Sequence, residues 1–151
     1  MRGMCSQWAQ FPYPGDNSMI RLQHAIKVAA PRATLYHALT DLDEMAAWHL
    51  GDVAGAITPG EVLTLRPKPG LHFAFRTEAL ELNTRLVQTE VEGPSHSAGR
   101  TLIFQLADLD DGHTLVELTH GEWDESDSHL PLCNTHWGYV LHRLKAHVEK
   151  A

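Results

Sequence analysis

The chain has 151 residues, of which 43% are hydrophobic and 21% charged, and its formal net charge is −7. This length and apolar content indicate a single globular domain with a sizeable core and exclude a disordered chain. The acidic balance argues against nucleic acid as a partner, and no apolar run approaches the ~18 residues that insertion into a membrane requires. Cys5 and Cys133 are the two cysteines, too few for a disulfide framework, which favours a reducing, cytoplasmic location.

Residues 1–19 are predicted to form an N-terminal extension that precedes one domain at residues 20–150. The extension contains no continuous apolar stretch typical of a secretion signal, but it carries Trp8, Phe11 and Tyr13 among prolines. Two interpretations stay open. It is a flexible extension, or an arm whose aromatic side chains dock on the domain or on a partner.

The first predicted strand covers residues 20–28, where apolar and polar residues alternate and His24 interrupts the apolar face. Pro31 ends this strand and suits the first turn of a short helix. Asp41 is typical of a residue that caps a second short helix, which we expect to end near Trp48.

From residue 51 onward, short apolar stretches are separated by turn-forming residues, which is typical of antiparallel strands. The clearest hairpin signal is the Asp-Gly pair at residues 111–112. The predicted strands cover residues 62–66, 71–82, 85–91, 101–107 and 113–120.

The C-terminal segment is predicted to be one long amphipathic helix that begins near Pro131. Trp137, Leu141, Leu144 and Val148 recur at helical spacing along it. The element order predicts an α+β fold in which this helix covers the apolar face of a curved antiparallel sheet of about six or seven strands. Incomplete filling between sheet and helix is a natural origin of a ligand pocket.

Several segments resemble one known superfamily. Residues 26–48, with IKVAAP followed by LYHALTD and Trp48, resemble the opening of START/polyketide-cyclase (SRPBCC) domains. More narrowly, they are similar to the bacterial group related to the C-terminal domain of the heat-shock-protein-90 ATPase activator. Residues 78–87 resemble a strand-turn-strand of that group, residues 111–121 its final strand, and residues 137–145 its long helix. The resemblance covers roughly residues 20–149.

This resemblance implies a helix-grip fold, in which the curved sheet wraps around the C-terminal helix, and it implies a hydrophobic cavity between them. It does not imply one activity, because members include lipid carriers, cyclases, hydroxylase components and co-chaperone domains.

The residues expected to face the interior are the candidate ligand contacts. Trp48 and Trp123 are placed near the mouth, Trp123 on the loop after the last strand, while Val87 is expected to line the interior with Val116 and Leu118. Either these residues fill a core, or together they form an aromatic wall for a flat, apolar ligand. The predicted ligand-binding residues are His24, Trp48, Phe73, Phe75, His120, Trp123, Trp137, Val140 and Leu141.

Two of the 11 histidines stand out, because His24 and His120 fall on the apolar faces of their strands. Each is a hydrogen-bonded core residue, a polar anchor for a ligand carbonyl or hydroxyl, or a general acid/base. His136 is a weaker candidate for the interior. The histidines expected in loops or on the surface are His37, His49, His113, His142 and His147.

No cofactor, metal site or catalytic residue is predicted. His129, Cys133 and His136 have spacings of four and three, but Pro131 separates His129 from the helix and no further ligand is evident. The glycines do not form a phosphate-binding pattern.

Three functions remain open. The leading one is binding of a small hydrophobic molecule in the cavity. The second is a protein-interaction role with a chaperone partner, like that of the ATPase activator. The third is a polyketide-cyclase-like enzyme that uses His24 or His120. The exposed aromatic residues and the resemblance are also compatible with a homodimer.

Overall fold

The computed structural model describes residues 19–93 and 98–150. The predicted extension, with Trp8, Phe11 and Tyr13, lies outside the described residues except for Met19, which opens the first strand. In chain order the elements are β1 (Met19–Val28), α2 (Arg32–Thr40), α3 (Leu42–Trp48), β2 (Asp52–Gly55), β3 (Val62–Lys68), β4 (Leu71–Glu81), β5 (Arg85–Glu92), β6 (Thr101–Asp108), η1 (Asp110–Gly112), β7 (Thr114–Asp124) and α4 (Leu130–Glu149).

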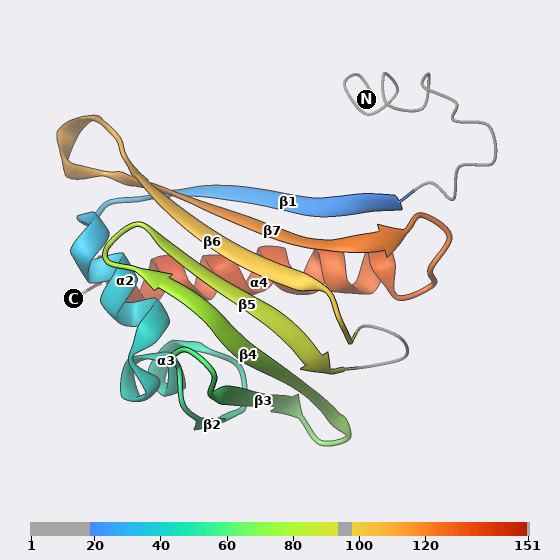
Figure 1. The fold of residues 1–151 in the computed structure, drawn as a ribbon. Helices are drawn as coiled ribbons and strands as arrows, with labels where there is room; N and C mark the ends of the chain where they lie inside the picture. Colours follow the sequence, from blue (N-terminus) through green and yellow to red (C-terminus); the bar gives the residue numbers. More distant parts are fainter. Residues whose placement is uncertain (1–18, 94–97, 151) are drawn as a thin grey trace, which may run out of the picture.

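The seven strands form one antiparallel sheet in the order β1-β7-β6-β5-β4-β3-β2. In the view of Figure 1, α4 runs behind the sheet along its length, and α2 and α3 lie at one end. The α+β helix-grip architecture predicted from the sequence is therefore confirmed, with the short β2 as a strand that the sequence did not delimit.

Local sequence explains where the helices begin. The Asp41 carboxylate accepts a hydrogen bond from the backbone N–H of Glu44 at 3.0 Å, so Asp41 caps α3 as predicted. Pro31 immediately precedes α2, and Pro131 lies in the first turn of α4, where its missing N–H leaves no helical hydrogen bond unmade.

The C-terminal half of α4 is tied to β1 and α3 by hydrogen bonds. Lys145 Nζ donates to the carbonyl of Lys27 at 2.8 Å, and Arg143 Nε donates to the carbonyl of Trp48 at 2.8 Å. The Glu149 carboxylate accepts from the Ala29 N–H at 2.8 Å. These contacts fix one end of the helix against the sheet. Its buried face consists of Cys133, Trp137, Val140, Leu141, Leu144 and Val148.

Trp123 does not lie where the sequence predicted, because β7 contains a bulge near its end. Ile20 pairs with Trp123, whereas Arg21 pairs with Gly121, so β7 carries one extra residue at Glu122. The extra residue shifts the side-chain alternation by one, because strand residues otherwise point to alternate faces. Trp123 consequently lies inside β7, not on the following loop, and points to the same interior as His120.

Strand β5 also differs from the prediction, because its buried positions are Leu86, Gln88 and Glu90. Val87 is on the opposite, partly exposed face, so its expected place in the interior is wrong. The alternation along β5 is regular and places Glu90 on the buried face, with Phe75 of β4 as its partner. A carboxylate therefore lies in the interior where the sequence predicted an aliphatic side chain.

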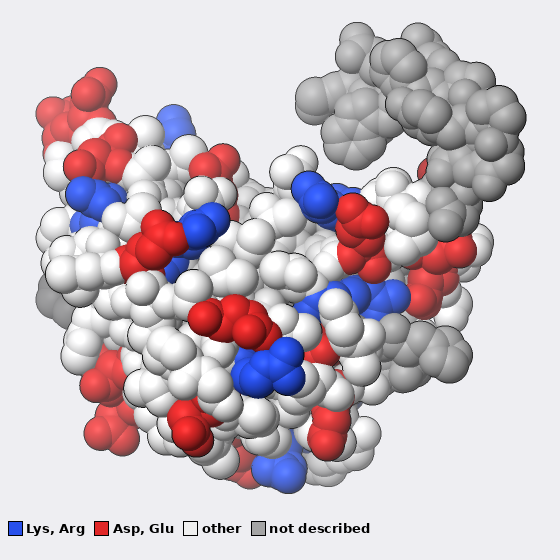
Figure 2. All heavy atoms as spheres, viewed as in Figure 1, with Lys and Arg blue, Asp and Glu red and all other residues white. Residues whose placement is uncertain are grey.

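The outer face of the sheet carries acidic and basic side chains in close proximity (Figure 2). Arg76 pairs with Glu78 at 2.8 Å and Arg21 with Glu122 at 3.2 Å, and all four side chains are exposed to solvent. Among the described residues, none of the helices combines the length and the apolar content needed to cross a membrane.

Candidate ligand-binding site

The predicted ligand-binding residues come from five elements of the fold and lie on the side of the sheet that α4 covers. Eight of the nine are buried and His24 is partly buried. By element they are His24 on β1, Trp48 on α3, Phe73 and Phe75 on β4, His120 and Trp123 on β7, and Trp137, Val140 and Leu141 on α4.

Five aromatic and imidazole rings form a continuous row in this interior. The ring centroids of His49 and His136 are 6.4 Å apart, and those of His136 and Trp137 are 5.2 Å apart. Trp137 is 5.4 Å from His120, which is 5.5 Å from Trp123. All four contacts are edge-to-face, an arrangement that aromatic pairs favour. The row thereby brings together the residue that follows α3 with residues from α4 and β7.

The phenylalanines of β4 pack against this row. Phe73 stacks on His136 with ring centroids 5.5 Å apart and an interplanar angle of 24°. The ring centroid of Phe75 lies 6.3 Å from that of Phe73 and 6.3 Å from that of Trp137. The rings of β4 and of the row therefore pack against one another as one cluster, and their role as a wall for a ligand stays a prediction.

A fully buried carboxylate is hydrogen-bonded to the row. Glu90 is 0% exposed and His120 is 1% exposed, and Glu90 Oε1 lies 2.8 Å from His120 Nε2. Trp137 Nε1 donates to His120 Nδ1 at 3.0 Å. An indole N–H can only donate, so Nδ1 carries no proton and Nε2–H is the donor to Glu90. His120 is therefore a neutral imidazole in a fixed tautomer.

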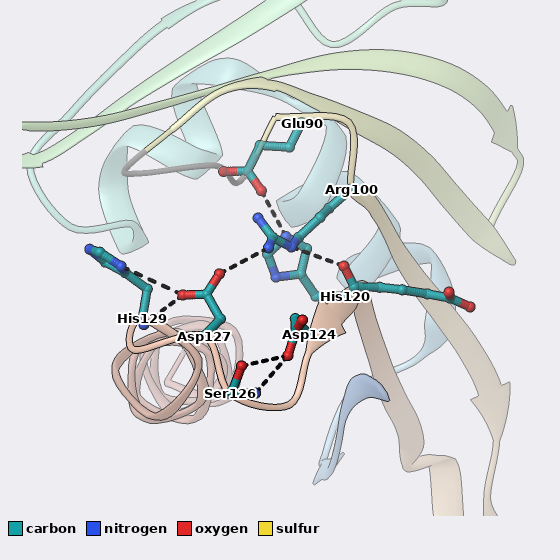
Figure 3. A network of polar contacts seen from close by, with 8 residues as sticks. Glu90, Arg100, His120, Asp124, Ser126, Asp127 and His129 are labelled. Atoms are coloured by element: carbon teal, nitrogen blue, oxygen red, sulfur yellow. Dashed lines mark hydrogen bonds and ion pairs between the residues drawn. The ribbon is translucent and has the colours of Figure 1, made fainter. Parts of the chain in front are cut away.

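Arg100 lies beside Glu90 and His120 (Figure 3). Its guanidinium lies 3.6 Å from the centroid of the Trp123 ring, a cation–π contact. Arg100 Nε donates to the carbonyl of Glu122 at 3.1 Å, and an amino group lies 3.4 Å from Asp127 Oδ2. Because Asp127 belongs to the loop between β7 and α4, these contacts connect that loop to the start of β6.

The loop between β7 and α4 has its own polar structure. Asp127 Oδ1 accepts from the backbone N–H of His129 at 2.8 Å, and Asp124 Oδ1 accepts from the N–H and the hydroxyl of Ser126 at 2.9 and 2.7 Å. The described residues contain no group of three or more histidine, cysteine or acidic residues arranged to hold a metal ion.

Burial sets the protonation of the interior groups. It lowers the pKa of His136 to about 4, with smaller contributions from His49 and His120, and it also lowers the pKa of His49. The pKa of the Cys133 thiol is raised to about 11, first by burial and then by the charge of Glu90. Near neutral pH these imidazoles are uncharged and the thiol is protonated.

The structure corrects the sequence analysis at His49, which was expected on the surface but is 5% exposed. Its Nδ1 lies 3.2 Å from the carbonyl of Leu50, while Nε2 has no hydrogen-bond partner among the described residues. His49 directly follows the last residue of α3, so no helical or strand periodicity indicated that it is buried.

Trp48 and His24 take no part in the hydrogen bonds that join Glu90, His120 and Trp137. Trp48 is 2% exposed, and its Nε1 donates to the carbonyl of Ala38 at 2.8 Å, which gives it a structural role between α2 and α3. The His24 ring lies close to Gly138 of α4, and burial lowers the pKa of His24. Of the two histidines singled out from the sequence, His120 alone belongs to the hydrogen-bonded row.

Two hollows in the described part of the chain lie outside this interior. One, with a volume of about 670 Å³, is bordered by Arg21, Thr101 and Thr119 at the outer surface of β1, β6 and β7. The other, about 390 Å³, lies beside the turn between β3 and β4. The expected cavity between sheet and α4 stays a prediction.

The fold and this interior define a START/SRPBCC-type domain. The family model described as "Activator of Hsp90 ATPase homolog 1-like protein" matches residues 29–149. The chain therefore belongs to this family, as the resemblance in its sequence indicated.

Solved structures agree with this assignment. The Aha1 dimer from Colwellia psychrerythraea has 29% sequence identity and a TM-score of 0.79, and the match covers 87% of this chain and 97% of that one. DynU16, from the dynemicin biosynthetic locus, has 19% identity and a TM-score of 0.72 over 85% of this chain and 47% of its own. CalU16 from Micromonospora echinospora has 20% identity and a TM-score of 0.71, and the match covers 86% of this chain and 76% of that one. The last two show a shared fold alone. No curated protein matches the sequence.

Proposed function

We propose that this chain binds a small hydrophobic molecule between the sheet and α4, in contact with the buried aromatic row. The observation that carries the proposal is the buried polar set within an apolar interior. Glu90 and His120 are 0% and 1% exposed, and Nε2 of His49 and Nε1 of Trp123 have no hydrogen-bond partner among the described residues.

Such a core is poorly optimised for stability alone. A buried polar atom without a partner costs about 1–3 kcal/mol, and a buried charged group costs more unless its contacts are well made. Unpartnered polar groups that persist in a core are typical of sites that acquire a partner from a ligand.

The arrangement of α4 supports entry at one end. The C-terminal half of the helix is held by the hydrogen bonds of Arg143, Lys145 and Glu149. The N-terminal half follows the loop that Arg100 contacts through Asp127 at 3.4 Å, which is long for a hydrogen bond. A ligand that displaces interior side chains therefore enters beneath the N-terminal half of α4.

The test is a thermal-shift screen with sterols, fatty acids and aromatic polyketides. A ligand at 100 times its Kd stabilises the folded state by about 2.7 kcal/mol, which corresponds to an increase in Tm of roughly 5–10 °C for a domain of this size. The site is then located by the indole N–H resonances, because binding is expected to shift those of Trp123 and Trp137 more than that of Trp48.

Val140→Phe provides a second test, since it fills the interior from α4, and Ala146→Phe on the exposed face of the same helix is the control. The ligand-induced shift is expected to disappear in the first variant and to persist in the second. Absence of any shift across the whole panel, or equal shifts in both variants, contradicts binding between sheet and helix.

A protein-interaction role like that of the ATPase activator is the second candidate. It is supported by the family match, by 29% identity to the Aha1 dimer, and by two large apolar side chains exposed on α4. Leu132 is 68% exposed and Tyr139 is 55% exposed, and their spacing of seven places them on one face of the helix. This face is the candidate contact for a chaperone or for a second copy of the chain.

The two functions are separated by the ATPase rate of a purified bacterial homologue of the 90-kDa heat-shock protein. Stimulation that is lost in a Leu132→Ser/Tyr139→Ser double variant supports the interaction role. Unchanged ATPase activity and no binding count against it. A polyketide-cyclase-like activity stays a prediction, as does the cytoplasmic location, with which the free buried thiol of Cys133 agrees.

A further inference from the structure

The end of the interior that contains Glu90, His120 and Arg100 (the polar end) holds a buried hydrogen-bond donor, Trp123 Nε1–H, for which the described residues supply no acceptor. Trp123 is 1% exposed, and its Nε1–H meets no acceptor within residues 19–93 and 98–150. The other two described tryptophans differ, because Nε1 of Trp48 donates to Ala38 at 2.8 Å and Nε1 of Trp137 donates to His120 at 3.0 Å.

The Trp123 ring is held in place from two sides. The His120 ring meets it nearly perpendicularly, with centroids 5.5 Å apart and an interplanar angle of 76°. The Arg100 guanidinium lies 3.6 Å from the centre of the ring. A donor whose orientation is fixed in advance loses little conformational entropy when it binds an acceptor.

The charges around this donor favour a neutral ligand. Two carboxylates lie at this end: Glu90 is hydrogen-bonded to His120 at 2.8 Å, and Asp127 lies 3.4 Å from the Arg100 guanidinium. Arg100, the cation beside the Trp123 ring, is therefore already paired with a carboxylate, while His120 is a neutral imidazole because Nδ1 accepts from Trp137. An additional anion entering this space meets repulsion in a region of low dielectric constant.

We infer that the polar end of the interior recognises the oxygen of a neutral carbonyl compound (a ketone, ester or amide) through Trp123 Nε1–H and discriminates against carboxylates. This inference rests on the proposed function and specifies the chemistry of its ligand. The carbonyl oxygen accepts the hydrogen bond for which the described residues offer no acceptor, and the apolar remainder of the ligand packs on the aromatic row.

Three probes of nearly equal size test the inference by isothermal titration: 2-acetylnaphthalene, 2-ethylnaphthalene and 2-naphthoate. The ketone is expected to bind about tenfold more tightly than the hydrocarbon, because it satisfies a buried donor. The carboxylate is expected to bind more weakly than either. Equal affinity of ketone and hydrocarbon, or tightest binding of the carboxylate, overturns the inference.

Trp123→Phe removes the donor and keeps an aromatic ring next to Arg100. In this variant the tenfold preference for ketone over hydrocarbon is expected to vanish, whereas Trp48→Phe retains the ratio because its N–H is already donated to Ala38. A preference that persists in Trp123→Phe refutes the role of the indole. Failure of all three probes and of the wider ligand panel contradicts the proposed function, whereas binding of the hydrocarbon without selectivity contradicts this inference alone.

Discussion

The three described tryptophans make a matched experiment on buried hydrogen bonds, since each is at most 2% exposed. Replacing each with Phe deletes one indole N–H and leaves a smaller ring. The space left behind costs about 1 kcal/mol in every case. The three variants therefore differ mainly in what happens to the hydrogen-bond partner.

Trp137→Phe leaves His120 Nδ1 as a buried acceptor without its donor, which adds about 1–3 kcal/mol of destabilisation. Trp48→Phe removes the donor from the Ala38 carbonyl, one of the last four carbonyls of α2 that no helical N–H satisfies. Trp123→Phe deletes an N–H that has no partner in the described structure. Relief of that cost offsets the lost volume and the weaker contact with Arg100, so its net effect is expected near zero.

The assay is urea-induced unfolding of the wild type and the three variants, with unchanged m-values as the criterion that all four unfold in the same way. Trp123→Phe is expected to be at least about 1 kcal/mol more stable than Trp137→Phe, a difference in Tm of roughly 2–4 °C or more. If the two variants lose the same stability, the Trp123 N–H is satisfied in the free protein, and the argument for a ligand carbonyl at this position fails.

Three further predictions concern other parts of the chain. Glu90→Leu leaves the Nε2–H of His120 without its acceptor, whereas Glu90→Gln keeps one. In urea unfolding, Glu90→Leu is therefore expected to lose about 1–3 kcal/mol more free energy of unfolding than Glu90→Gln. Equal losses contradict a proton on Nε2 of His120. In the folded protein the pKa of His136 is about 4, below its value of 6.5 in the unfolded chain. The stability that neutral His136 contributes is therefore complete above pH 6.5. It is lost as the pH falls toward 4, by at most about 3 kcal/mol of unfolding free energy. His136→Gln is expected to reduce this pH dependence, as followed by thermal unfolding from pH 7 to 4, and an unchanged slope contradicts the assignment. The Leu132→Ser/Tyr139→Ser variant is expected to keep its unfolding free energy within about 0.5 kcal/mol of wild type and, where the wild type sediments as a dimer, to sediment as a monomer.

The sequence was sufficient for the architecture because its strongest signals are periodic. Alternation in residues 20–28 and the helical recurrence of Trp137, Leu141 and Leu144 are set by one buried face, and burial of that face dominates folding. The structure reproduces these elements as β1 and α4 with end points close to those predicted.

The polar part of the site could not be read in the same way, because it depends on the sheet register and on which face of a strand is buried. The bulge at Glu122 moves Trp123 to the interior, whereas β5 alternates regularly but buries Gln88 and Glu90 in place of Val87. One residue more or less in a pairing reverses the face of every following side chain. His120 was identified because a histidine on an apolar face needs a partner, but the identity of that partner required the sheet register.

The polar groups near the two halves of α4 differ in what they contact. Toward the C-terminus, Leu144 and Val148 are buried, and the polar groups there hold the helix to β1 and α3. Toward the N-terminus, the interior contains the Glu90–His120 pair and the Trp123 N–H, which has no acceptor in the described part of the chain, and the loop that precedes the helix contacts Arg100 at the long distance of 3.4 Å. The buried polar groups that would gain most from a ligand therefore lie beneath the N-terminal half of α4, where ligand binding is proposed.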